Sequence, residues 1–124
     1  MHKSMFAILV AVVVILAVGP SDAGIKRPAF FNGTKLEMAC QADAAPLDAG
    51  VCFGYVLGVA DLGEGLQTAS DKRFWCWPDD MSVTVGMERA MDAVRAYLAK
   101  YPESREWSGS AVVWEALKEK FPCH

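Results

Sequence analysis

Four cysteines are the feature of this sequence that most restricts its fold, namely Cys40, Cys52, Cys76 and Cys123. Their number is even, and no two of them form a Cys-x-x-Cys pair of the kind that binds zinc. After residue 23 the only histidine is the terminal His124, which leaves a metal site short of ligands. In an oxidising compartment such a set is typical of two disulfides, although four cysteines allow three connectivities. We therefore expect two disulfides and no bound metal or other cofactor.

The N-terminus has the pattern of an export signal. A short polar start precedes the unbroken apolar run Met5–Val18, and the small residues Ser21 and Ala23 fit a signal-peptidase site. An uncleaved membrane anchor is the weaker alternative, because a helix of this length spans roughly 21 Å of a ~30 Å hydrocarbon core. The sequence predicts a signal peptide over residues 1–23 and one domain over residues 24–124 that works outside the cytoplasm.

Length and charge exclude several classes of protein. A chain of 124 residues supports one small domain. Its net charge is −3, and the basic residues are scattered rather than gathered in a stripe. Such a distribution offers no footprint for nucleic acid and no polybasic patch for a membrane surface.

The spacing of apolar residues predicts four helices and no strand. They are expected at Thr34–Gln41, from Val51 to about Leu62, from Ser82 or Thr84 to Tyr101, and at Ser110–Phe121. Thr34 and Glu37 have the form of a capping box at the first start, and Pro102 and Pro122 end the last two helices. The fold class is therefore all-α, a small four-helix bundle held by two disulfides.

The second helix carries a pair of glycines that needs an explanation. Gly54 and Gly58 lie four residues apart, and each costs about 1 kcal/mol relative to alanine in a helix interior. We expect another helix to cross closely there. The flanking segments Asp43–Gly50 and Asp61–Asp80 contain glycine, proline and many polar residues, so we expect a connector and a long irregular stretch.

An antiparallel arrangement of the helices favours one pairing of the cysteines. Cys40 closes the first predicted helix and Cys52 opens the second, so a short hairpin brings them together. Cys76 precedes the third helix and Cys123 follows the fourth, and an antiparallel pair sets those two ends side by side. The expected pairs are Cys40–Cys52 and Cys76–Cys123.

Little in the sequence points to catalysis. His124 lies at a terminus, where a general base is hard to position. Asp79 and Asp80 precede the third helix and are expected to favour its positive end, and Asp61 is expected to be a hydrogen-bond partner in a loop. We expect a protein that is not an enzyme.

Several short motifs together resemble the Rap/Tai immunity protein family of type VI secretion. They are the segment Cys52–Asp61, Cys76-Trp-Pro78, Val83-Thr84, Tyr97-Leu98-x-x-Tyr101-Pro102, and the closing Phe121-Pro122-Cys123. The resemblance implies a small helical bundle related to the acid-stress chaperone HdeA. It also implies a periplasmic protein, commonly a homodimer, that binds and inhibits a peptidoglycan amidase delivered by competing bacteria. The chain departs from the family at Trp77 and Met87, which affects local packing and a helix-start hydrogen bond.

The resemblance also implies where a partner protein would bind. Family members place the third helix and the loop after it in the toxin's substrate groove, which transfers to Glu103, Arg105, Glu106 and Trp107. A solvated loop is the alternative for those charges. Trp75 is a further candidate contact, since tryptophan often anchors interfaces, although it and Trp107 could equally cover the core. Trp77 and Trp114 are expected to cover a disulfide and the core.

Two functions of different class follow. The first is a periplasmic immunity protein that binds and inhibits a type VI amidase effector. The second is an HdeA-like acid-stress chaperone, because the excess of acidic over basic residues reverses the net charge on acidification.

Overall fold

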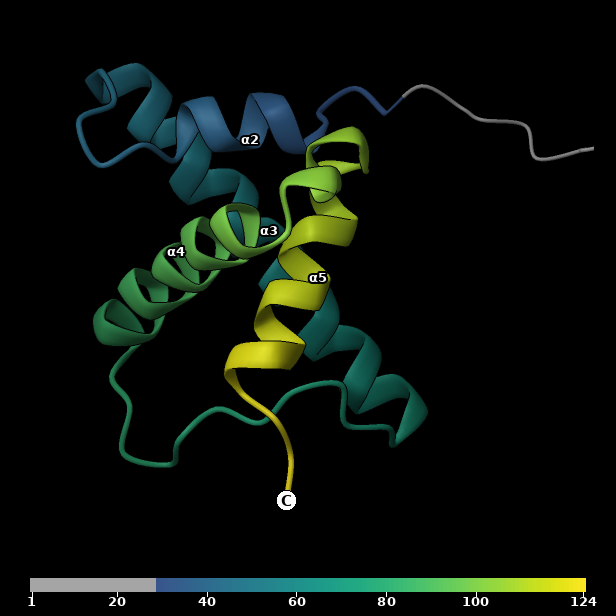
Figure 1. The fold of residues 1–124 in the computed structure, drawn as a ribbon. Coiled ribbons are helices and arrows are strands. Elements are labelled where there is room, and N and C mark those ends of the chain that lie inside the picture. Colours follow the sequence, from purple (N-terminus) through teal and green to yellow (C-terminus); the bar gives the residue numbers. More distant parts are fainter. Residues whose placement is uncertain (1–28) are drawn as a thin grey trace, which may run out of the picture.

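The computed structural model describes residues 29–124, which form four α-helices and one 3-10 helix (Figure 1). The elements are α2 (Gly33–Ala39), α3 (Pro46–Ser70), α4 (Val83–Lys100), η1 (Pro102–Glu106) and α5 (Gly109–Lys120). Within this range the only strand-like feature is an isolated bridge between Asn32 and Ser108. The all-α prediction is confirmed, whereas the predicted signal peptide and cleavage site lie outside the described residues.

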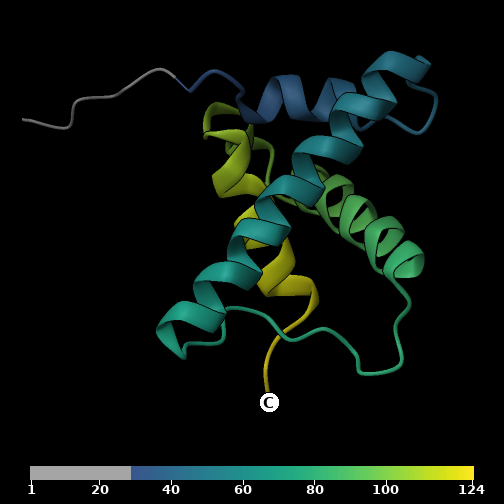
Figure 2. The ribbon, with the colours of Figure 1, turned by 180° about the vertical axis from the view of Figure 1, so that it is seen from behind.

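Helix α3 crosses the molecule diagonally, and α4 and α5 pack together on one side of it (Figures 1 and 2). The short α2 lies across the N-terminal end of α3 and contacts η1. The arrangement is two layers of helices around one core, which is the minimum that buries an apolar stripe on each helix. The opposite side of α3 has no helix against it within the described residues (Figure 2).

The core lies where α3, α4 and α5 meet. The predicted stripes of the last two helices supply much of it, because Val94 and Leu98 of α4 and Val113 and Leu117 of α5 are at most 1% exposed. Further buried side chains come from α2, α3, α5 and the segments that flank the helices, namely Leu36, Val56, Val112, Phe121 and Trp75. Apolar residues at helical spacing therefore located the inner faces of α4 and α5 correctly.

Both disulfides have the predicted pairing. Cys40 is bonded to Cys52, and Cys76 is bonded to Cys123, with Cα atoms 5.0 Å apart in each pair. The first bond ties α2 to α3. The second ties the segment before α4 to the end of the chain, where the backbone N–H of Cys76 also donates to the carbonyl of Phe121.

The predicted bounds of α3 were wrong at both ends. The expected connector is already helical from Pro46, because proline at the first helical position loses no hydrogen bond. The expected irregular stretch from Asp61 is helical to Ser70, and the helix ends only at Asp71, whose φ is 54°. Gly63 lies inside this helix and does not break it. The missing side chain of Gly63 leaves space for the Trp75 ring, which any Cβ there would overlap.

The start of α2 also differs from the prediction. Its N-cap is Asn32, whose side chain accepts a hydrogen bond from the Lys35 N–H at 3.0 Å, so Thr34 and Glu37 form no capping box. Asparagine is among the best N-cap residues, and a helix beginning one residue earlier satisfies the same orphan donors. Glu37 is thereby left for a different contact, described below.

The expected helix crossing at Gly54 and Gly58 is not found in the described chain. A Cβ built on either glycine would have no atom within 4 Å, so both face outward. By length and composition α3 could cross a membrane. It is nevertheless joined to α2 through Cys52 and packs its inner face on α4 and α5, as the central helix of a small bundle does.

Candidate protein-binding surface

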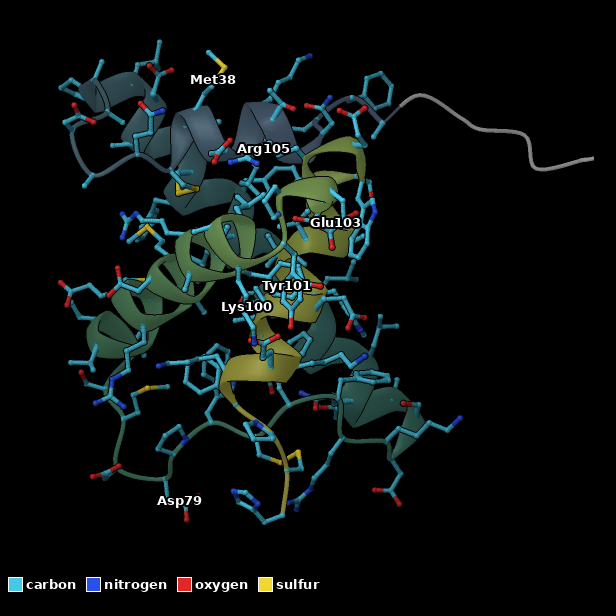
Figure 3. The ribbon with its side chains drawn as sticks, viewed as in Figure 1. Met38, Asp79, Lys100, Tyr101, Glu103 and Arg105 are labelled. Carbon is cyan, nitrogen blue, oxygen red and sulfur yellow. A yellow bond between two sulfur atoms is a disulfide. The ribbon has the colours of Figure 1, made fainter. Side chains whose placement is uncertain are left out.

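The segment between α4 and α5 is a tight 3-10 turn that packs against α2, α4 and α5. Pro102 stands at its first position, and the N–H groups of Ser104 and Trp107 donate to the carbonyls of Tyr101 and Ser104 at 3.0 and 3.1 Å. Proline pre-sets the backbone for such a turn and cannot continue α4. The predicted charged loop is therefore an ordered element, of which Glu103 and Arg105 are labelled in Figure 3.

The inner side of η1 is fastened to α2. Ser104 is completely buried, and its hydroxyl donates to the Tyr101 carbonyl at 2.6 Å. Gly33 packs so closely below it that a Cβ there would overlap the Ser104 carbonyl oxygen. The buried hydroxyl and the glycine together fix how near the two elements lie.

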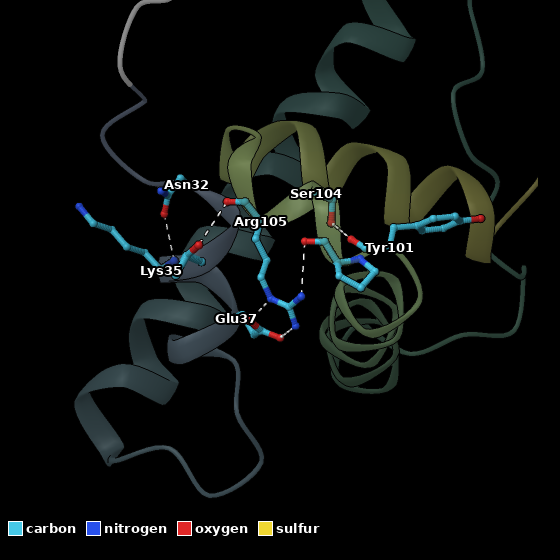
Figure 4. Close-up of polar contacts among 8 residues, drawn as sticks. Asn32, Lys35, Glu37, Tyr101, Ser104 and Arg105 are labelled. Atoms are coloured by element: carbon cyan, nitrogen blue, oxygen red, sulfur yellow. Dashed lines mark hydrogen bonds and ion pairs between the residues drawn. The ribbon is translucent and has the colours of Figure 1, made fainter.

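Arg105 forms a bidentate ion pair with Glu37 (Figure 4). Its Nε and Nη2 donate to the two carboxylate oxygens at 2.6 Å each, and Thr34 donates to the Arg105 carbonyl at 3.4 Å. This geometry is the strong form of an arginine–carboxylate contact. The hydrogen bond from Arg105 lowers the pKa of Glu37, and the same bond raises the pKa of Arg105. Arg105 is thus already paired with a residue of its own chain.

The backbone after η1 is held from both sides. The Gly33 N–H donates to the Trp107 carbonyl at 2.9 Å, and the Gly109 N–H donates to the Phe31 carbonyl at 2.8 Å. The Trp107 ring remains 40% exposed, with the Tyr97 ring centre 6.5 Å away. A large ring on a fixed backbone, half open to solvent, has the properties of an interface anchor.

The outer side of η1 is acidic. Glu103 and Glu106 are exposed, and neither forms an ion pair within residues 29–124. Lys100, which precedes the segment, is already paired with Glu119 at 2.7 Å. We call Glu103, Glu106 and Trp107 the η1 edge, a surface of two free carboxylates beside one aromatic ring.

Trp75, the remaining candidate contact, is placed in the core. Its side chain is 1% exposed, and its ring lies 5.0 Å from that of Trp114 in an edge-to-face arrangement. Trp77 packs on Phe121 with ring centres 4.6 Å apart. Trp77 and Trp114 are half-buried against the core, as predicted, and Trp75 lies behind them rather than on the surface.

Glu64 is the residue that sequence reasoning missed. One of its carboxylate oxygens accepts the indole N–H of Trp75 at 2.8 Å and that of Trp77 at 2.6 Å. Gln67, one turn on, donates to Glu64 and accepts the backbone N–H groups of Phe74 and Trp75 at 2.6 and 3.2 Å. Both belong to the part of α3 that was expected to be irregular, so their common helix face was not recognised.

The described chain offers no constellation for metal chemistry. Residues 29–124 hold no group of three or more histidine, cysteine or acidic side chains that could bind a metal ion. Asp79 is exposed at the other end of the molecule from Arg105 (Figure 3). Asp61 lies within α3 rather than in a loop, and it too is exposed.

Comparison with protein-family models identifies a family for this chain. A family model described as Rap1a immunity proteins matches residues 32–123, from the N-cap of α2 to the last cysteine of the second disulfide. No curated protein matches the chain.

Proposed function

Because the chain belongs to the family of Rap1a immunity proteins, we propose that it binds and inhibits a peptidoglycan amidase delivered by type VI secretion. Immunity proteins of this kind act by binding an effector protein and are generally not enzymes. The match over residues 32–123 is the observation that carries the proposal, because it covers every helix of the bundle and both disulfides.

The η1 edge is the surface that we assign to the effector. Trp107 supplies exposed apolar area, and Glu103 and Glu106 supply two exposed carboxylates. Trp75 and Arg105 are left out of the proposed contact, since one is buried and the other is paired with Glu37. A fixed turn is suited to this role, because an ordered surface loses little entropy on binding.

We place the protein in the periplasm. Two disulfides fit an oxidising compartment. Under this proposal, residues 1–23 are a cleaved export signal and residues 24–124 are the mature domain. An inhibitor in the periplasm would meet the amidase where the cell wall lies.

We also propose that the mature protein forms a homodimer through the outer face of α3. Leu47 and Leu62 are 79% and 62% exposed, and Val51 and Leu66 are 40% and 43% exposed on the same helix. Sedimentation of the purified protein tests this part separately. A sedimentation coefficient that remains that of a monomer at micromolar concentration contradicts it.

The inhibitor proposal is tested with a purified type VI peptidoglycan amidase, sought first among the genes that neighbour this one. The two proteins should co-purify, and hydrolysis of peptidoglycan should stop on addition of this protein. Trp107→Ala should weaken inhibition by about thirtyfold or more, as expected for an anchor worth about 2 kcal/mol. Phe30→Ala is the matched control, because Phe30 is fully exposed and lies outside the η1 edge.

Two outcomes would overturn the proposal at different levels. Undiminished amidase turnover at excess wild-type protein removes the inhibitor function itself. Inhibition that survives Trp107→Ala together with Glu103→Lys and Glu106→Lys keeps the function and removes the η1 edge as its surface.

A further inference from the structure

An apolar groove of about 260 Å³ lies between α3 and the N-terminal half of α4. Its floor is formed by the nearly buried side chains of Val56, Ala60 and Ala90. Methionines and Leu57 form its walls, and the segment from Trp77 to Ser82 closes one end. None of the residues of the η1 edge lines this groove.

Small residues keep the groove open. Ala60 of α3 and Ala90 of α4 both line it, and Gly86 leaves space in which the Met81 side chain lies. A Cβ on Gly86 would come within 3.1 Å of the Met81 Cε atom. Met81, Met87 and Met91 give walls of flexible thioether side chains, which adapt to apolar groups of differing shape.

The charge around the groove has one sign. Among residues 29–124, Asp61 and Glu64 are the only charged residues that line it, and no lysine or arginine of this range does so. Glu64 is engaged by the indole N–H groups of Trp75 and Trp77. Asp61 is exposed and forms no ion pair within residues 29–124, so its carboxylate is available at the rim.

We propose that this groove binds a segment of a partner protein that carries long apolar side chains beside a lysine or arginine. The volume lies just below the ~300 Å³ at which pockets for whole small molecules begin, and it suits a few side chains. An amphipathic helix laid in a groove presents such a set, with apolar residues one turn apart. The basic residue would pair with Asp61, the one free charge at the rim.

Three synthetic fourteen-residue helical peptides test the groove, each titrated into the nitrogen-15-labelled mature protein. One carries two leucines four residues apart with a neighbouring lysine, the second replaces lysine with glutamate, and the third replaces the leucines with alanine. The leucine–lysine peptide should shift the amide resonances of Leu57, Ala60, Gly86 and Ala90. The alanine peptide should bind about tenfold or more weakly, because it loses the buried apolar area.

The contribution of charge is measured with Asp61→Asn, and Asp48→Asn is the control because Asp48 lies on the same helix outside the groove. Asp61→Asn should weaken the leucine–lysine peptide by about two- to fivefold, as for an exposed ion pair, and Asp48→Asn should not. No binding at millimolar peptide, equal binding of the lysine and glutamate peptides, or resonance shifts away from the groove would each overturn the proposal. None of these measurements contains the amidase, so their failure leaves the inhibitor proposal untouched.

Discussion

Among single substitutions, we expect replacement of Glu64 to have a large effect on the stability of the fold. Its carboxylate accepts the indole N–H groups of Trp75 and Trp77 through the same oxygen, at 2.8 and 2.6 Å. Trp75 is 1% exposed, so in Glu64→Ala its N–H would lose its acceptor inside the protein. Trp77 is half-buried, and its N–H can find solvent.

The size of the effect follows from this difference. A hydrogen bond to a charged group contributes about 1.5–3 kcal/mol, and a buried donor left without a partner costs about 1–3 kcal/mol. Counting Trp75 in full and Trp77 hardly at all, we expect Glu64→Ala to lower the free energy of unfolding by about 2–4 kcal/mol. That is a large share of the roughly 5–15 kcal/mol that holds a small domain together. Glu64→Gln keeps an acceptor oxygen and should cost about 1 kcal/mol.

Urea unfolding with both disulfides intact, followed by far-ultraviolet circular dichroism, measures these free energies. Glu88→Ala serves as the control, since Glu88 is exposed on α4. The tryptophan emission of Glu64→Ala should also shift to longer wavelength in the folded state. If Glu64→Ala unfolds within about 0.5 kcal/mol of the wild type, the indole contacts do not hold the loop on α3, and the reasoning is wrong.

Two further predictions concern space and charge. Gly63→Ala should destabilise the fold by about 1–3 kcal/mol because its methyl group overlaps the Trp75 ring, whereas Gly58→Ala on the open face should stabilise it by up to about 1 kcal/mol. Thermal unfolding of the pair checks both, and equal effects of the same sign would contradict the packing argument. The pKa of Glu37 is lowered chiefly by its hydrogen bond from Arg105, so this contact adds stability above the unfolded-state pKa of Glu37 and loses it as the pH falls through the folded value. Arg105→Gln should raise the Glu37 pKa in a carbon-13 titration, and an unchanged pKa would show that the ion pair is absent in solution.

The fold could be predicted from the sequence where its signals were local. The stripes of α4 and α5 follow from residue spacing, and Pro102 ends α4 as expected. The pairing of Cys76 with Cys123 followed once those two helices were taken as antiparallel. Each of these inferences needed only the order and length of neighbouring helices.

The errors at α3 come from contacts between distant residues. Gly63 and Gly65 are among the glycine, proline and polar residues on which the prediction of an irregular stretch over Asp61–Asp80 rests, but Gly63 is required by the ring of Trp75, twelve positions later. Helix propensity accounts for the free energy that a glycine costs in a helix, but it does not account for a distant ring that packs on that glycine. Once α3 is known to continue, Glu64 and Gln67 fall on the side that meets the tryptophans.

The candidate surface could be predicted only in part from the sequence, because it too depends on contacts between distant residues. The resemblance brought together the segment from Glu103 to Trp107, and the structure shows Trp107 half-exposed on an ordered turn. The partner of Arg105 is Glu37, 68 positions away, and no local pattern relates the two. Burial of Trp75 likewise depends on α3 and α5 packing around it.

The rigidity of the η1 edge depends on a path of contacts that begins at the central helix. Cys52 is fixed in α3, and its disulfide with Cys40 holds the C-terminal end of α2. From α2, Glu37 holds the guanidinium of Arg105, and the N–H of Gly33 at the start of the helix donates to the carbonyl of Trp107. Because α2 is only seven residues long, it would be unstable alone, and a helix that short needs tertiary anchors to stay folded. A covalent bond at one end of α2 and an ion pair between α2 and η1 therefore stabilise the backbone that carries Trp107.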